Sequence, residues 1–255
     1  MTPSKPKQAD DFIRIQDLFY LCLAKWRWFV VSLAVTLGIA VYYLLTTPPV
    51  YTRSASLLIK EDSKGQSLSS DVSSTFADMG LFQANTNVNN ELLSLQSPAV
   101  MLDVVKRLHL NIDYLTDGTF YKQVLYGQTL PMSISFFGLQ DNETASLTLR
   151  QGTSGKLELS GFTRNGEEVE GQIEGKLNDT IASPIGKLMV EPTPYYNIGF
   201  HEPVYITRST LHGATDAYSS RLSVALSDEK ATVINLSFQD VCIQRAEDVL
   251  NTVIA

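Results

Sequence analysis

The chain has 255 residues, of which 20 are Lys or Arg and 27 are Asp or Glu, so its formal net charge is -7. Charged residues make up 18 % of the chain, below the roughly 25 % that soluble domains usually carry. The acidic balance argues against a nucleic-acid-binding protein, which needs a basic surface to neutralise phosphates. Two cysteines exclude a disulfide-stapled scaffold and a cysteine-rich zinc site.

The shortage of charge is concentrated in one stretch near the N-terminus. From Trp28 to Thr52 there is no charged residue and no histidine, and the densest apolar run within it is Trp28 to Leu45. At about 1.5 Å per residue this run spans roughly 27 Å, close to the hydrocarbon thickness of a bilayer. We therefore predict a transmembrane helix over 28–47, stopped by Pro48 and Pro49. Aromatic residues of the kind found at membrane interfaces lie near the two ends: Trp26, Trp28, Tyr42, Tyr43 and Tyr51.

The charge distribution predicts the orientation of this helix. Residues 1–27 hold five Lys or Arg and three Asp, which gives +2 and leaves −7 − 2 = −9 for the remainder. Lys25 and Arg27 stand directly at the membrane edge. By the positive-inside rule, residues 1–27 are expected in the cytoplasm and residues 48–255 outside it. The two cysteines, Cys22 and Cys242, would then lie on opposite sides of the membrane, unable to pair.

The first elements outside the membrane are expected to be a strand, a polar loop and two helices. Residues alternate in polarity from Tyr51 to Ile59, which predicts a strand, and a serine-rich loop runs from Glu61 to Ser74. Helical spacing appears from Val88 to Leu95. A second helix is predicted to begin with Ser97 as N-cap and Pro98 at its first position, and to end near His109. Its apolar stripe is formed by Val100, Met101, Val104, Val105 and Leu108.

Residues from about 115 to 210 are predicted to be rich in β-structure, as an insertion into the rest of the domain. Asn165-Gly166 is a hairpin turn signal between Phe162 and Val169. The expected strands lie around 132–136, 146–149, 156–162, 187–191 and 204–207.

The C-terminal part returns to mixed structure. We predict a weak helix from Ala214 to Leu222, strands over 223–226 and 231–238, and a last helix capped by Asp240. This helix has no closing signal before Ala255, so the chain is expected to stop inside it. Its core-facing residues are Cys242, Ala246, Val249, Leu250 and Val253. The predicted fold class is an α+β extracytoplasmic domain, a mixed sheet packed with helices, on an N-terminal transmembrane helix.

No pattern in the chain predicts a catalytic, cofactor or metal site. Gly161 and Gly166 have the separation of a phosphate-binding loop, but Glu167 follows where such a loop needs lysine. The three histidines, His109, His201 and His212, lack the spacing of a helical metal site. There is no Gly-x-Ser-x-Gly motif.

Carboxylate pairs and one aromatic pair are weaker candidates. Glu167-Glu168, and Glu191 with Glu202, could serve glycoside chemistry only if the fold placed them face to face. Tyr195-Tyr196 beside Asn197 is a candidate glycan platform, although an anchoring role in a core or loop is the more ordinary interpretation.

Three stretches carry a family resemblance. They are TTPPVYTRSASLLIKED at 46–62, NELLSLQSPAVMLDVVKRLHLNI at 90–112 and ATVINLSFQDVCIQRAEDVLNTVI at 231–254. Over about 12–112 and 217–255 the chain resembles Wzz-type polysaccharide co-polymerases, and it is most similar to the N-terminal region of their bacterial tyrosine-kinase (Wzc-like) branch. Pro48, Pro49 and Tyr51 form the membrane-exit motif of this resemblance.

The resemblance implies a role in chain-length control, polymerisation and export of capsular or exopolysaccharide. Expected partners are further copies of the chain, the lipid bilayer, a polysaccharide polymerase and outer-membrane export machinery, with glycan left open. The expected location is the bacterial inner membrane, with the main domain periplasmic. A longer parent protein would add a helical stem, a second membrane helix and a cytoplasmic kinase domain that uses ATP and Mg; no cofactor is expected in these 255 residues.

Two alternatives remain. The chain could be the extracytoplasmic ligand-sensing domain of a membrane signalling receptor, which would continue into a histidine-kinase helix pair. A periplasmic adaptor of a secretion system is less favoured, because the chain shows neither a long helical hairpin nor lipoyl-like repeats.

Overall fold

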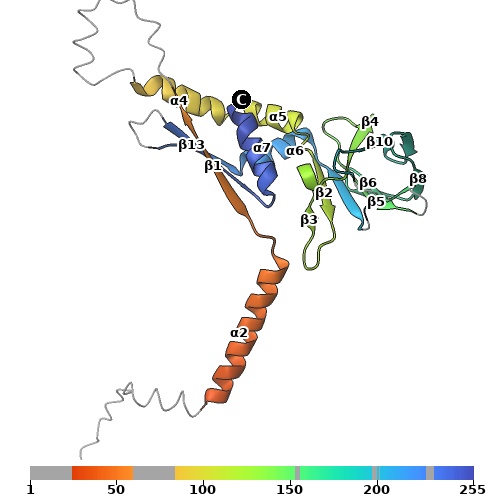
Figure 1. Ribbon diagram of the computed structural model, residues 1–255, viewed down its shortest axis with the longest axis horizontal. Coiled ribbons are helices and arrows are strands. Elements are labelled where there is room, and N and C mark those ends of the chain that lie inside the picture. Colours follow the sequence, from red (N-terminus) through yellow and green to blue (C-terminus); the bar gives the residue numbers. More distant parts are fainter. Residues whose placement is uncertain (1–24, 60–83, 153–155, 197–199, 201, 228–232) are drawn as a thin grey trace, which may run out of the picture. The chain divides into compact units, whose positions relative to one another are not determined.

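The computed structural model describes residues 25–59, 84–152, 156–196, 200, 202–227 and 233–255. The chain divides into two units, residues 1–47 and 48–255, and each is treated separately. The first contains helix α2 (Trp26–Thr46), and the second mixes helices and antiparallel strands (Figure 1). The predicted α+β class is therefore confirmed.

A three-stranded antiparallel sheet organises one part of the second unit. Strand β1 (Tyr51–Leu58) pairs with β13 (Val233–Asp240), which pairs on its other side with β12 (Leu222–Leu226). The register places Tyr51 opposite Asp240, so the first strand of the unit pairs with its last. The predicted alternation in β1 is confirmed, since Ala55, Leu57 and Ile59 pack against the core.

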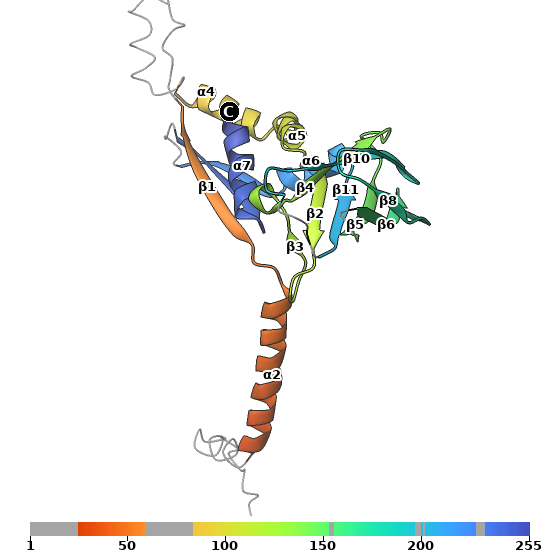
Figure 2. The ribbon, with the colours of Figure 1, turned by 45° about the vertical axis from the view of Figure 1, so that its right-hand side comes forward.

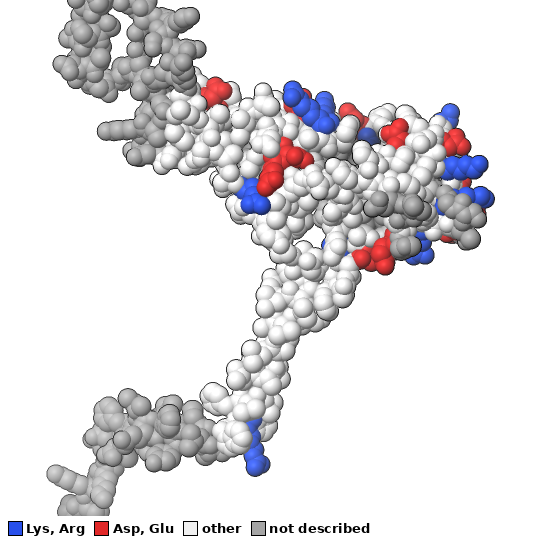
Figure 3. Space-filling model, in the orientation of Figure 1, with Lys and Arg blue, Asp and Glu red and all other residues white. Residues whose placement is uncertain are grey.

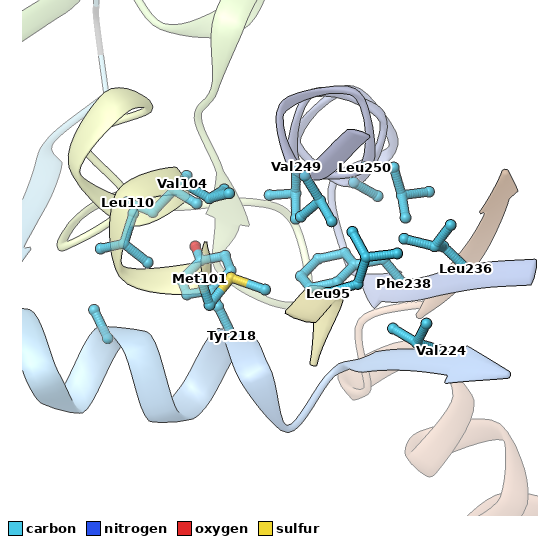
Figure 4. Packing of buried hydrophobic residues seen from close by; sticks show 14 of the residues in the cluster. Leu95, Met101, Val104, Leu110, Tyr218, Val224, Leu236, Phe238, Val249 and Leu250 are labelled. Atoms are coloured by element: carbon cyan, nitrogen blue, oxygen red, sulfur yellow. The ribbon is translucent and has the colours of Figure 1, made fainter. Parts of the chain in front are cut away.

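Four helices complete this part: α4 (Ala84–Leu95), α5 (Pro98–Arg107), α6 (Leu211–Ser219) and α7 (Ile243–Ile254). Their apolar faces meet the sheet in one continuous core, shown in Figure 4. The rings of Tyr218 and Phe238 stack there with centroids 6.1 Å apart. Within α7, Ala246, Val249, Leu250 and Val253 are buried as predicted.

Helix α5 follows its sequence signals closely. The Ser97 hydroxyl accepts a hydrogen bond from the Ala99 amide at 3.3 Å, and Pro98 opens the helix. After the last turn, His109 adopts a positive φ of 51°, a left-handed conformation that ends the helix. The buried stripe is narrower than predicted: Met101, Val104 and Val105 are buried, whereas Val100 and Leu108 lie at its margin.

The stretch from 112 to 208 builds two further sheets around a second core. The larger has the order β3-β2-β11-β5-β6-β7, with β8 also paired to β6, and the smaller has the order β4-β10-β9. The buried side chains of both sheets form one cluster, which includes Met132, Leu149, Phe162, Leu188 and Ile206. The strands are β2 (Ile112–Thr116), β3 (Gln123–Val124), β4 (Met132–Phe137), β5 (Ala145–Gln151), β6 (Leu157–Arg164), β7 (Glu167–Val169), β8 (Ile173–Gly175), β9 (Thr180–Ser183), β10 (Gly186–Pro192) and β11 (Val204–Arg208), with a short 3-10 turn at Gly127–Thr129.

The predicted Asn165-Gly166 hairpin joins β6 to β7. Both residues have positive φ, 51° and 85°, as a tight two-residue hairpin turn requires. Phe162 pairs with Val169 across the hairpin, so the predicted turn between these two residues is confirmed. The turn also removes Gly161 and Gly166 from consideration as a phosphate-binding loop.

Three predictions near the C-terminus need correction. The helix predicted from Ala214 begins at Leu211, because the Thr210 hydroxyl accepts a hydrogen bond from the Gly213 amide at 3.0 Å and caps it. It ends at Ser219, and Leu222 already belongs to β12. Cys242 was expected within the last helix but occupies its N-cap position, half-buried.

The third correction concerns Asp240, which is not the N-cap of α7. It is the last residue of β13 and continues the buried face of Ile234, Leu236 and Phe238, so its carboxylate points into the protein. The loop 61–74, Cys22 and most of the predicted cytoplasmic segment 1–27 lie outside the described residues.

Candidate functional site: a membrane-span helix and a charged hollow

Helix α2 has the length and composition of a membrane span. It runs from Trp26 to Thr46, 21 residues, which at about 1.5 Å per residue is roughly 32 Å, the thickness of a bilayer core. None of its residues is buried: Trp28 is 75 % and Leu45 42 % exposed. Figure 3 shows its surface free of charged side chains along most of its length. A helix that is apolar all round and uncovered by protein suits a lipid environment.

The two threonine side chains of α2 find partners within the helix itself. The Thr36 hydroxyl donates to the Ser32 carbonyl at 2.7 Å, and the Thr46 hydroxyl donates to the Tyr42 carbonyl at 2.9 Å. Such bonds to the preceding turn satisfy the hydroxyl donors without water. These contacts remove part of the cost of placing threonine in hydrocarbon.

The predicted exit residues lie where α2 ends. The helix stops at Thr46, and Thr47 is already extended with φ −95° and ψ 122°, the conformation that a following proline imposes. Pro48 and Pro49 form the short connection, and Tyr51 opens β1. The role of these residues as a membrane-exit motif stays a prediction.

A cluster of four charged residues, two of them buried, lies in the second unit. Arg245, in the first turn of α7, donates from Nε and Nη2 to the two carboxylate oxygens of Asp240 at 3.0 and 2.8 Å. Its Nη1 donates to Asp113 of β2 at 2.9 Å, and Arg221 donates to Asp240 at 3.2 Å. Asp240 also accepts the Cys242 amide at 2.8 Å. Two arginines and two aspartates therefore compensate one another where β13 and α7 meet β2.

The cluster keeps Arg245 charged despite its burial. Burial alone disfavours the guanidinium ion, but Tyr218, Asp240 and Asp113 around it outweigh that effect and raise the pKa of Arg245. Burial also raises the pKa of Tyr218, whose ring lies 5.7 Å from the Arg245 guanidinium and 5.1 Å from that of Arg221. Tyr218 consequently remains a neutral phenol that offers its ring to two cations.

The four residues of the cluster all line a hollow of about 550 Å³. Its lining is drawn from the residue that precedes β1, the end of β13, the hairpin β2–β3, β11, the turn between α6 and β12, and α7. The lining residues are Val50, Asp113, Leu115, Val124, Thr207, Arg221, Gln239, Asp240, Val241 and Arg245. This volume is within the range of small-molecule sites, and the lining combines apolar walls with convergent polar groups.

Sequence reasoning missed this cluster, although a signal was present. Asp240 follows Ile234, Leu236 and Phe238 at the period of two that defines the buried face of β13. Arg245 precedes Val249 by four residues and so shares the apolar face of α7. A charged residue on a buried face implies a buried partner, and two such residues near one corner would have indicated an ion pair.

The other candidate residues are dispersed. Glu167 and Glu168 are exposed on β7, and Glu191 lies on β10 while Glu202 is in a loop. Tyr195 is exposed in a turn, and Tyr196 is partly buried. Asn197 and His201 lie outside the described residues. Within the part of the chain that the structure describes, no group of three potential metal ligands comes together.

Comparison with known proteins supports the resemblance seen in the sequence. Residues 11–108 match the family model Wzz, chain length determinant protein. A curated relative, tyrosine-protein kinase ptk from Acinetobacter johnsonii, is 30 % identical over 118 residues, which is 46 % of this chain and 15 % of the relative. The chain thus spans about a seventh of that protein's length. The matched family segment includes α2, β1, α4 and α5. The resemblance to the Wzz-type family is therefore confirmed over residues 11–108, where the chain matches the Wzz chain length determinant model.

Proposed function

We propose that the chain is the membrane-anchored part of a polysaccharide co-polymerase that acts in chain-length control, polymerisation and export of capsular or exopolysaccharide. One observation carries this proposal: the family match runs without a break from the membrane-span helix α2 into β1, α4 and α5. The anchor and the first elements of the α+β unit are thus matched together. In this proposal the chain acts as a scaffold that assembles with further copies of itself, as the resemblance to polysaccharide co-polymerases implies.

The proposed topology places residues 1–27 in the cytoplasm, 28–47 in the inner membrane and 48–255 in the periplasm. It is supported by the +2 charge of residues 1–27 against −9 beyond them, and by Lys25 and Arg27 at one end of α2. Alkaline phosphatase, which is active only outside the cytoplasm, tests this when fused after Ile59 and, separately, before Lys25. Activity of the first fusion alone supports the orientation, and activity of the second alone contradicts it.

The link to a tyrosine autokinase is a further part of the proposal. It is supported by the similarity to a protein named tyrosine-protein kinase ptk. The parent protein would carry a cytoplasmic domain that binds ATP and Mg, in which assembly of periplasmic units is coupled to phosphorylation. Incubation of the full-length protein with ATP and Mg, followed by detection of phosphotyrosine, tests this link; a reading frame that stops soon after codon 255 would contradict it.

The proposed partners are further copies of the chain, the polymerase and the outer-membrane export machinery. Crosslinking of the full-length protein in membranes, with mass determination of the products, tests self-assembly. Homo-oligomeric products are expected, and exclusively monomeric protein at native expression levels would contradict this part of the proposal.

The decisive experiment is a deletion of the gene followed by complementation. Surface polysaccharide from the deletion strain should change in its length distribution on a gel, and the wild-type gene should restore it. A matched control gene carries charged substitutions in α2, Leu37→Arg and Val41→Arg, which oppose membrane insertion but leave residues 48–255 unchanged. Restoration by this control would contradict a membrane-anchored function. An unchanged polysaccharide together with altered ligand-dependent gene expression would instead support the sensing-receptor alternative.

A further inference from the structure

The hollow opens at the end of the second unit where the chain arrives from the membrane-span helix. Val50 lines it, and only Thr47, Pro48 and Pro49 separate Val50 from Thr46, the last residue of α2. Four residue steps span at most about 14 Å when fully extended. If α2 crosses the bilayer, as the proposed function requires, the covalent chain alone keeps one wall of the hollow close to the membrane surface.

A second feature at the same end suits a membrane surface. The β2–β3 hairpin contributes Leu115 and Val124 to the hollow, and these two residues pair with each other. Figures 1 and 2 both show this hairpin extending to the same side of the unit as the start of β1. Its connecting loop carries Phe120, which is 58 % exposed, followed by Tyr121 and Lys122. An exposed aromatic ring beside tyrosine and lysine is typical of segments at a membrane interface.

The partly exposed part of the lining, which we call the mouth of the hollow, contains one cation, Arg221, and one anion, Asp113. Arg245 and Asp240 are nearly fully buried and bind each other, whereas the side chains of Arg221 and Asp113 are 42 % and 41 % exposed. Among the described residues, the Arg221 guanidinium donates a single hydrogen bond, to Asp240, and the Asp113 carboxylate accepts one from Arg245. Further guanidinium N–H groups and carboxylate lone pairs therefore remain for a ligand.

We propose that this hollow binds the headgroup of a zwitterionic phospholipid that carries a phosphate and a primary ammonium. The phosphate accepts hydrogen bonds from Arg221, and the ammonium donates to Asp113. The glycerol and upper acyl carbons lie against the apolar wall of Val50, Leu115 and Val124. A ligand with both charges matches the mouth better than a neutral sugar does, and the lining residues include no aromatic ring on which a sugar could stack.

The test measures lipid retention by the purified full chain in detergent with native mass spectrometry. Phosphatidylethanolamine, phosphatidylcholine and phosphatidylglycerol are added one at a time. Phosphatidylethanolamine is expected to be retained at least about tenfold more strongly than the other two, because each of them lacks an ammonium that can donate to Asp113. The variants Arg221→Gln and Asp113→Asn should each weaken its retention by a similar factor, and Asp113→Asn should abolish the preference over phosphatidylcholine.

Arg164→Gln is the matched control. Arg164 is also 42 % exposed and pairs with a carboxylate, Glu143, at 2.7 Å, but it does not line the hollow. Its lipid retention should equal that of the wild type. Near-ultraviolet circular dichroism of the tyrosines checks that each variant is folded, so that a loss of lipid binding is not confused with unfolding.

Equal retention of phosphatidylethanolamine and phosphatidylcholine by the wild type would overturn the proposal, as would wild-type retention in both hollow variants. Displacement of the lipid by a neutral oligosaccharide would assign the hollow to glycan instead. Extraction of membranes with carbonate distinguishes failure of the lipid-site proposal from failure of the proposed function. Wild-type protein that stays in the membrane but shows no headgroup preference refutes the lipid site alone, and protein that leaves the membrane refutes the anchor.

Discussion

Replacing Arg245 with methionine should destabilise the second unit strongly. The substitution keeps much of the side-chain volume but deletes three hydrogen bonds, two to Asp240 and one to Asp113. Asp240, only 2 % exposed, would keep the Cys242 amide and Arg221 as partners. Breaking a buried ion pair by removing one partner costs about 3–5 kcal/mol. The two remaining partners put the expected loss at the lower end of that range, about 3 kcal/mol, a large share of a total stability of about 5–15 kcal/mol.

The assay is unfolding of the full chain by guanidinium in detergent, monitored by the near-ultraviolet circular dichroism of its tyrosines. Arg221→Gln is the control, because Arg221 is half-exposed and makes one bond to the same carboxylate; it should cost less than about 1 kcal/mol. The double variant Asp240→Leu/Arg245→Met removes both buried charges and should recover more than half of the loss. If Arg245→Met costs no more than Arg221→Gln, the hydrogen bonds from Arg245 to Asp240 and Asp113 do not stabilise the fold by the expected amount.

Three further predictions concern the turn, the helix cap and a buried phenol. Gly166→Ala should cost about 1 kcal/mol for backbone conformation alone, since φ is 85° and a Cβ there would meet nothing within 4 Å; a chemical unfolding curve matching the wild type would contradict this. Ser97→Ala should cost about 1 kcal/mol through loss of the cap on the Ala99 amide, with Ser97→Asp retaining most of the stability in the same assay. Burial, opposed in part by the hydrogen bond that the hydroxyl oxygen accepts from the Ile134 amide, raises the pKa of Tyr114 to about 12. The folded state therefore holds this proton more tightly than the unfolded chain, and the resulting stability is complete below pH 10 and lost as the pH rises from 10 to 12; Tyr114→Phe should flatten that decline when unfolding is compared at pH 9 and pH 11.

Local signals in the sequence predicted the elements whose ends are set by their own residues. Ser97 and Pro98 define the start of α5, and Asn165-Gly166 defines the turn between β6 and β7. In each case the required conformation belongs to one or two residues, so that tertiary contacts have little influence on it. The apolar length of α2 is similarly a property of a single contiguous stretch.

The elements that were misplaced depend on partners far away in the chain. Helix α6 is an exception in part: its start is set by the local cap of Thr210, which was missed, although its apolar face packs on α5, which lies about a hundred residues earlier. The short strands β3, β7, β8 and β9 have two to four residues each. They are too short for a period of two to be recognised, and they exist because a longer neighbour offers its edge.

The charged hollow was the part of the structure that was hardest to predict from the sequence. Asp113 and Arg245 meet across 132 positions, and no local rule predicts that pairing. The two buried charges could have been noticed by their place on apolar faces, but the identity of their partners follows only from the way in which β2, β13 and α7 converge.

The pairing of β1 with β13 has a consequence for biogenesis. Tyr51 pairs with Asp240, so β1, the first strand to be synthesised in the second unit, must wait for 240 − 51 = 189 further residues before its partner exists. At a synthesis rate of about 5–20 residues per second this delay is on the order of 10–40 s. Throughout it the apolar side of β1, with Ala55, Leu57 and Ile59, has no partner sheet to cover it. A nascent chain of this architecture is therefore most exposed to aggregation while the residues between β1 and β13 are being made, and a chaperone that covers β1 would act on it in that interval.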